Sequence, residues 1–185
     1  ANLNERGVQL FQNVRVTDLS DQPFTAENPP MYNGNIKIHF DWALANEEEI
    51  QAGDYYTYQL PEYFAIHNEV SGELARAGGQ SLGTFTLSND GVLTVTFNEA
   101  AQTLSNRSGS IDLVTELNVS TVTEEVTIST GIYDQDGHEI IITLPIYEID
   151  IMKKGNVTSS GSVVWEIIFN QTKRELHDVV VTDPM

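Results

Sequence analysis

Residues 35–42 read NIKIHFDW, and this stretch decides the fold. Every second side chain in it is apolar, and the side chains between them are charged or can become charged. A period of two is typical of a β-strand with one buried face and one wet face. The apolar face holds Ile36, Ile38, Phe40 and Trp42, and the polar face holds Lys37, His39 and Asp41.

The same alternation recurs along the chain, with turn signals between the segments. Residues 55–61, 92–97 and 111–117 each repeat it, and Asp-Gly pairs at 90–91 and 136–137 are typical of hairpin turns. Two stretches, 44–50 and 98–106, predict a turn or two of helix. We therefore predict an all-β fold, an Ig-like antiparallel β-sandwich. Its predicted core is Phe40, Trp42, Tyr58, Leu93, Val95, Phe97, Ile111 and Leu113.

The composition excludes several classes of function. With 27 acidic and 9 basic residues the net charge is -18, which disfavours nucleic acid and anionic membranes as partners. Because there is no cysteine, disulfides, thiolate metal sites and cysteine nucleophiles are excluded. No apolar run is long enough for a membrane span, and no signal peptide or sorting signal stands out. If the protein is secreted, we expect this chain to be a piece of it.

Three stretches together resemble a known family. They are FDWALANEEEIQAGDYYTYQLPEYF (40–64), LGTFTLSNDGVLTVTFNE (82–99) and NRSGSIDLVTELN (106–118). The chain resembles the Ig-like region of Gram-positive cell-wall-anchored adhesins of the collagen-binding type. The resemblance implies an extracellular, non-catalytic ligand-binding region that attaches to host extracellular matrix, such as collagen, or to a surface glycan. A structural stalk or pilus-type module and a carbohydrate-binding module are the alternative hypotheses.

The last forty residues look like the start of a second domain. We predict a boundary near Pro145, with a first Ig-like subdomain over 1–145. Residues 146–185 contain a strand ending in lysine, a Gly/Ser turn and a strand with Trp165. The resemblance implies that they begin a second Ig-like subdomain of the isopeptide-forming type, truncated here. Its apolar face would be uncovered, so we expect either self-association through 146–185 or covering strands elsewhere in the protein.

Lys153 and Asp183 are the candidates for chemistry. Period-two alternation aims both side chains at the apolar interior, where burial lowers a lysine pKa and raises an aspartate pKa. The resemblance implies that Lys153 is the nucleophile of a Lys–Asn isopeptide bond and Asp183 its proton-shuttling acid. The acceptor asparagine would lie in a later strand that is absent from the chain. The alternative is a lysine that reaches water and an aspartate that begins an Asp-Pro turn.

Metal and enzyme signals are weak. Asp134, Asp136 and Glu139 could ligate calcium, but their loop lacks the spacing of an EF-hand, and a solvated hairpin turn is the expected alternative. The histidines His39, His67, His138 and His177 have no zinc-site spacing. No nucleophile–base motif stands out. We predict no enzymatic activity, no cofactor and no tightly bound metal.

Overall fold

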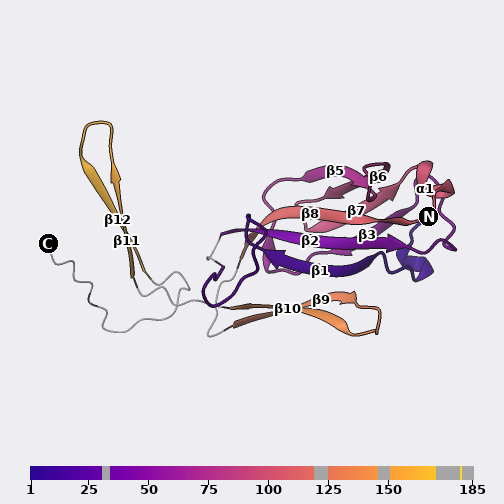
Figure 1. Cartoon of the computed structure of the whole chain (residues 1–185), viewed down its shortest axis with the longest axis horizontal. Coiled ribbons are helices and arrows are strands. Elements are labelled where there is room, and N and C mark those ends of the chain that lie inside the picture. Colours follow the sequence, from indigo (N-terminus) through magenta and orange to yellow (C-terminus); the bar gives the residue numbers. More distant parts are fainter. Residues whose placement is uncertain (31–33, 119–124, 146–150, 170–179, 181–185) are drawn as a thin grey trace.

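A computed structural model describes residues 1–30, 34–118, 125–145, 151–169 and 180, and its fold is a β-sandwich (Figure 1). Two four-stranded sheets enclose one core, and every pairing between neighbouring strands is antiparallel. The first sheet has the order β1 (Phe11–Thr17), β2 (Asn35–Leu44), β8 (Arg107–Leu117) and β4 (Phe64–Ala65). The second has the order β3 (Tyr55–Gln59), β7 (Val92–Phe97), β6 (Ser81–Leu87) and β5 (Val70–Ala75).

A third sheet lies against the sandwich on its β1 side. It is a hairpin of β9 (Glu125–Tyr133) and β10 (Glu139–Pro145), closed by the predicted turn at Asp136-Gly137. Its inward side chains are buried: Val126, Ile128, Ile132, Ile142 and Leu144. Because the Tyr58 hydroxyl donates to the Thr130 carbonyl at 2.6 Å, β3 is also tied to β9. The hairpin therefore shares the core of the sandwich.

The predicted core is confirmed, with one side chain at its margin. Seven of the eight predicted side chains are at most 2% exposed. Tyr58 is only half-buried, and its ring lies 5.6 Å from the rings of Phe11 and Phe40. Trp42 packs edge-on against Phe97. It also lies over Gly109, where an added Cβ would come within 2.4 Å of the Ala75 carbonyl oxygen. The close approach of β8 to the end of β5 thus requires a glycine.

Helix is scarce, and one predicted turn of helix is wrong. A 3₁₀ turn spans Asn4–Arg6, and α1 spans Ala100–Thr103 inside the predicted stretch 98–106. Residues 45–50, by contrast, form turns and a bend after β2 ends. Arg107 from β8 binds the carbonyls of Ala45 and Glu48, which a helix would need for its own ladder. Tertiary contacts override the local preference there.

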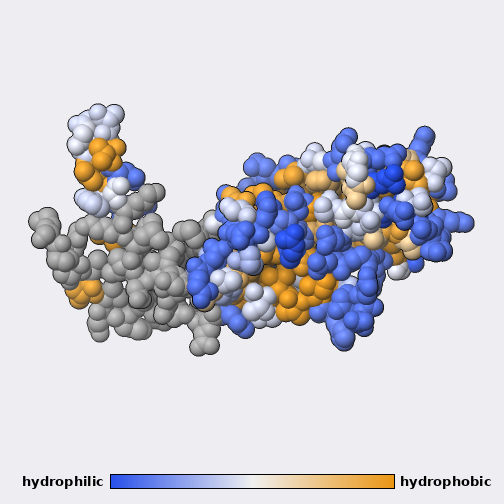
Figure 2. Space-filling view, in the orientation of Figure 1, coloured by the Kyte–Doolittle hydropathy of each residue, from blue (hydrophilic) through white to orange (hydrophobic). Residues whose placement is uncertain are grey.

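A separate hairpin follows the sandwich. It consists of β11 (Ile151–Val157) and β12 (Val163–Phe169), paired in unbroken register. Within the described residues it joins neither sheet of the sandwich, and Figure 1 draws it apart from them. Apolar side chains lie on its surface (Figure 2). Val157, Val163, Val164, Trp165 and Ile167 are between 39% and 75% exposed.

Candidate functional site

An open groove lies where three segments distant in sequence meet. We call it the β3–β9 groove. It has a volume of about 730 Å³ and is lined by residues 59–62, 64–66, 89–91 and 129–131. These are the end of β3 with the link into β4, the β6–β7 turn, and the middle of β9. Its apolar floor is built on Leu60 and Phe64, both of which are buried.

A bulge in β9 forms one wall of this groove. The register between β9 and β10 shifts there, and Gly131 adopts a φ of 66°, in the left-handed region that favours glycine. The Glu139 carboxylate holds the bulge, because it accepts hydrogen bonds from the Gly131 amide at 2.9 Å and from the Ser129 hydroxyl. The Ser129 bond, and then the Gly131 bond, lower the pKa of Glu139.

The opposite wall is the Asp-Gly turn between β6 and β7. The Gln59 side-chain amide donates to the Asp90 carbonyl at 3.0 Å, and the Leu60 amide donates to the Gly91 carbonyl at 2.9 Å. Gly91 has a φ of 77°, as the predicted turn requires. These bonds fix the turn to the end of β3. The Asn89 and Asp90 side chains remain exposed at the rim.

A threonine, a histidine and an aspartate meet on the outer face of the first sheet. His39 Nε2 lies 2.8 Å from Thr17 Oγ1, and His39 Nδ1 lies 2.7 Å from Asp112 Oδ1. The order resembles a nucleophile–base–acid relay. However, Thr17 is 3% exposed and its hydroxyl donates to the Asp18 carbonyl, so no external substrate reaches it. The cluster fastens the loop after β1 to β2 and β8.

The sequence did not predict this cluster. His39 belongs to the polar face of its strand, yet it is buried, because the loop that follows Thr17 covers it. His39 and Asp112 are direct cross-strand neighbours, so the pairing register of β2 and β8 is the signal that finds them. A second carboxylate, that of Asp21, lies 3.6 Å from His39 Nε2 and pairs with Lys37 at 2.6 Å. The Lys37 ammonium lowers the pKa of Asp21.

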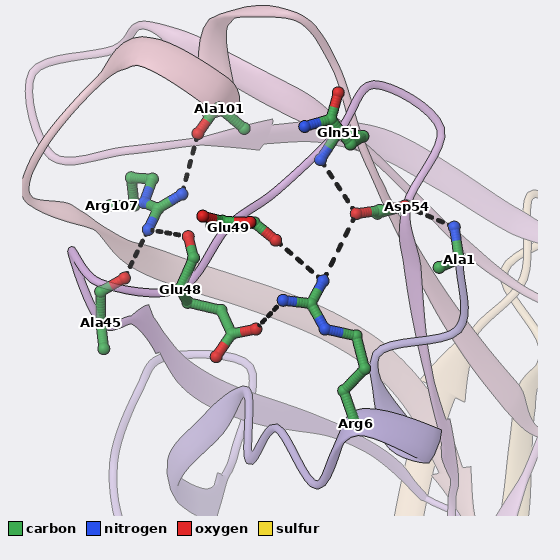
Figure 3. Close-up of polar contacts among 9 residues, drawn as sticks. All are labelled: Ala1, Arg6, Ala45, Glu48, Glu49, Gln51, Asp54, Ala101 and Arg107. Atoms are coloured by element: carbon green, nitrogen blue, oxygen red, sulfur yellow. Dashed lines mark hydrogen bonds and ion pairs between the residues drawn. The ribbon is translucent and has the colours of Figure 1, made fainter.

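A network of hydrogen bonds and ion pairs holds the 45–54 loop in place (Figure 3). Arg107 is buried, and besides the carbonyls of Ala45 and Glu48 it binds that of Ala101 at 2.9 Å. Asp54, also buried, accepts the Gln51 amide at 2.9 Å and pairs with the Ala1 ammonium. The ammonium, and then the Gln51 bond, hold the pKa of Asp54 below its ordinary value. Every contact here is internal, so the network stabilises the loop.

The predicted calcium ligands are only partly brought together. Ligand atoms of Asp134, Asp136 and His138 lie within 4.8 Å of one another, and all three residues are exposed. Glu139 points away into the bulge of β9. Asp134 Oδ1 accepts the backbone amides of Asp136 and His138 at 2.9 Å. These bonds build the hairpin turn, which accounts for the cluster without an ion.

The remaining residues singled out in the sequence lie in separate parts of the chain. The backbone of Lys153 lies in β11, opposite Ile167 of β12. Asp183 and His177 lie outside the described residues. His67 pairs with Glu116 at 2.9 Å on the surface of the sandwich.

In the described ranges, no helix is both long and apolar enough to cross a membrane.

Comparisons with known proteins agree with this architecture. The sequence profile of a bacterial Ig domain matches residues 29–127. A search of curated proteins found no match. The serine-rich repeat protein Srr2 of Streptococcus agalactiae has a similar solved structure, with 15% identity and a TM-score of 0.54 over 83% of this chain and 49% of that one.

Two further solved structures are similar. The serine-rich repeat adhesion glycoprotein Srr1 of Streptococcus agalactiae has 16% identity and a TM-score of 0.48 over 82% of this chain and 49% of that one. The collagen binding domain of the Erysipelothrix rhusiopathiae surface protein RspB has 17% identity and a TM-score of 0.45 over 88% of this chain and 56% of that one. The chain therefore spans about half the length of the solved structures it matches.

Proposed function

Because the chain belongs to the bacterial Ig domain family, we propose that it is a non-catalytic binding region of a bacterial cell-surface adhesin. One observation carries this proposal: the Ig-like sandwich presents an open groove, while the Thr17–His39–Asp112 cluster is shut off from substrates. The likeness to Srr2 supports the Ig-like fold on which this proposal is built. The partner is a host extracellular-matrix protein, such as collagen, or a surface glycan. The full-length protein is extracellular and anchored to the cell wall.

The domain boundary near Pro145 is part of the proposal. Residues 1–145 form the first Ig-like subdomain, and residues 146–185 begin a second. The exposed apolar side chains of β11 and β12 support this division, because such a hairpin is only marginally stable alone in water. Further strands of the longer protein, or a second copy of the chain, would cover them. The second case predicts a dimer whose formation depends on residues 146–185.

A covalent crosslink in the second subdomain is the chemical part of the proposal. The Lys153 amine attacks the side-chain carbonyl carbon of an asparagine outside this chain, a C–N bond forms, and ammonia leaves. Asp183 carries the proton from the amine to the leaving group. Intact mass under denaturing conditions tests this step: a longer protein with the remaining strands should be lighter than its sequence by one ammonia. A Lys153→Ala variant that shows the same loss would disprove the assignment.

Solid-phase binding tests the adhesive role. The longer protein is immobilised and screened against collagen, other matrix proteins and a glycan array. Saturable binding to a matrix protein is the expected result, and binding only to glycans would favour a carbohydrate-binding module. A protein that binds nothing in either screen would be a stalk or pilus-type module, and the adhesin proposal would fail.

A further inference from the structure

We propose that the β3–β9 groove binds an extended peptide segment in which an apolar side chain lies next to a lysine or arginine. The inference rests on the binding role proposed above and narrows it to one class of partner. It follows from the shape of the groove, from its charge, and from the kind of side chains that form its floor.

The floor suits an apolar side chain. Leu60 and Phe64 are 3% and 6% exposed, and Pro61 and Ile66, both half-buried, add apolar surface to the lining that a ligand can reach. A volume near 730 Å³ is within the range of sites that hold several residues of a ligand. A Cβ added at Gly131 would meet nothing within 4 Å, so a peptide backbone can approach the bulge of β9 unhindered.

The rim suits a cation. Two exposed carboxylates, Glu62 and Asp90, stand on it, and the Glu139 carboxylate lies behind Gly131. None of the described residues that line the groove is a lysine or an arginine. Among the described residues, Glu62 and Asp90 make no ion pair or hydrogen bond through their carboxylates, whereas Asp21 and Asp54 elsewhere on the sandwich are paired with cations. A lysine or arginine would therefore find acceptors that no internal cation occupies.

A peptide fits this floor better than a sugar does. Sugar rings are commonly held against the exposed face of an aromatic side chain. Phe64 is the single aromatic residue among the described residues that line the groove, and it is buried. The rim instead combines carboxylates with hydroxyl and amide groups from Ser129, Gln59 and Asn89. Such groups can bond both to a peptide backbone and to a cationic side chain.

Amide chemical shifts of the full chain test the inference. The probe is the capped tetrapeptide acetyl-Gly-Leu-Lys-Gly-amide, with acetyl-Gly-Leu-Gln-Gly-amide and maltotriose as comparison ligands. We expect saturable shifts at the backbone amides of Gln59, Gly91 and Gly131 with the lysine peptide. The glutamine peptide should bind about fivefold more weakly, the size expected for a solvent-exposed ion pair. Equal binding of the glutamine peptide or of maltotriose would overturn the partner class, and absence of shifts would overturn the site.

A matched pair of double variants tests the charge argument. Glu62→Gln with Asp90→Asn should weaken the lysine peptide by about fivefold or more while the rest of the amide spectrum is unchanged. The control, Glu5→Gln with Glu73→Gln, removes two exposed charges outside the groove and should leave the affinity unchanged. An equal loss in the control would mean that only the net charge attracts the peptide.

Failure of this inference differs from failure of the adhesive role. If the full chain shows no peptide shifts while the longer protein still adheres in the solid-phase screen, another surface carries adhesion and the groove proposal alone is overturned. If the longer protein adheres to nothing, the adhesive role fails whatever the peptide titration shows.

Discussion

The sandwich buries most of its large apolar side chains, whereas the β11–β12 hairpin exposes several of them. In the sandwich, Trp42 is 1% exposed and packs between the two sheets, whereas Trp165 of the hairpin is 59% exposed. Charge differs as well: residues 1–145 hold 21 acidic and 5 basic residues, but residues 146–185 hold 6 and 4. A strongly charged surface around a closed core is typical of a self-sufficient unit. A nearly neutral hairpin with exposed valines and tryptophan is typical of a unit that needs a cover.

Two tryptophan variants should show the largest difference in stability between the two regions. Trp42→Ala removes a buried ring and should lower the free energy of unfolding by about 3–5 kcal/mol. Trp165→Ala should change the unfolding of the sandwich by no more than about 0.5 kcal/mol, because its side chain lies outside that core. Urea unfolding followed by circular dichroism measures both. Comparable losses in the two variants would mean that the hairpin is part of the same cooperative unit.

Two arginine variants should show how much a buried guanidinium contributes to the stability of the sandwich compared with a more exposed one. Arg107→Met removes three buried hydrogen bonds and leaves the Ala45 carbonyl with only the Glu48 amide, so it should cost about 2–4 kcal/mol. Arg76→Met should have a much smaller effect, since among the described residues the Arg76 side chain makes one hydrogen bond, an exposed one to the Ser105 carbonyl. Thermal unfolding of both variants checks this. Equal effects would show that the 45–54 loop does not depend on the buried guanidinium.

Tyr58→Phe tests whether β9 and β10 belong to the sandwich. The variant keeps the ring but removes the bond to Thr130, so we expect a loss of about 1 kcal/mol and faster hydrogen exchange in β9. Burial raises the pKa of Tyr58, which places its hydroxyl in the neutral, donating form at neutral pH. Tyr133→Phe, on the exposed side of the hairpin, is the control and should change neither quantity.

Asp18 gives the sandwich a stability that depends on pH. The Gln22 amide, and then Asn28, bind the carboxylate and lower its pKa below 3.8. A lowered folded-state pKa means that the stabilisation is present above the unfolded-state pKa and is lost as the pH falls through the folded-state value. Asp18→Ala should therefore reduce the melting temperature by a few degrees at pH 7, and the difference should shrink below pH 3.8. A difference that does not change with pH would contradict this role.

Removing residues 146–185 should have the smallest effect on stability. A chain that ends at Pro145 should melt at the same temperature as the full chain, because the hairpin shares no sheet with the sandwich in the described residues. Binding of an apolar dye should fall, since the exposed hairpin side chains are gone. A large drop in melting temperature would instead make the two regions one domain.

The sequence predicted the strands better than it predicted the sites. Alternation in 35–42 and 92–97 identified the buried faces, because each position in a strand faces the core or the solvent by parity alone. The helix expected at 44–50 is absent because Arg107, distant in sequence, competes for its carbonyls. The β3–β9 groove is lined by residues near 60, 90 and 130. A local sequence pattern cannot predict that these three segments lie together in the fold. The burial of His39 could not be predicted either, because a loop covers this side chain although strand alternation places it on the solvent side.

The placement of the two ends of the sandwich has a mechanical consequence. Leu3 bonds to Tyr55 at the beginning of β3, while Pro145 ends β10 at the other end of the strands (Figure 1). Tension between these points runs along the strand axes, and hydrogen bonds between antiparallel strands are perpendicular to that direction. Because β10 is hydrogen-bonded only to β9 among the described strands, the load passes through the β9–β10 ladder and then through the apolar contacts of that hairpin with the sandwich. Resistance to such a pull therefore depends on the buried side chains Val126, Ile128 and Leu144 as well as on hydrogen bonds between strands.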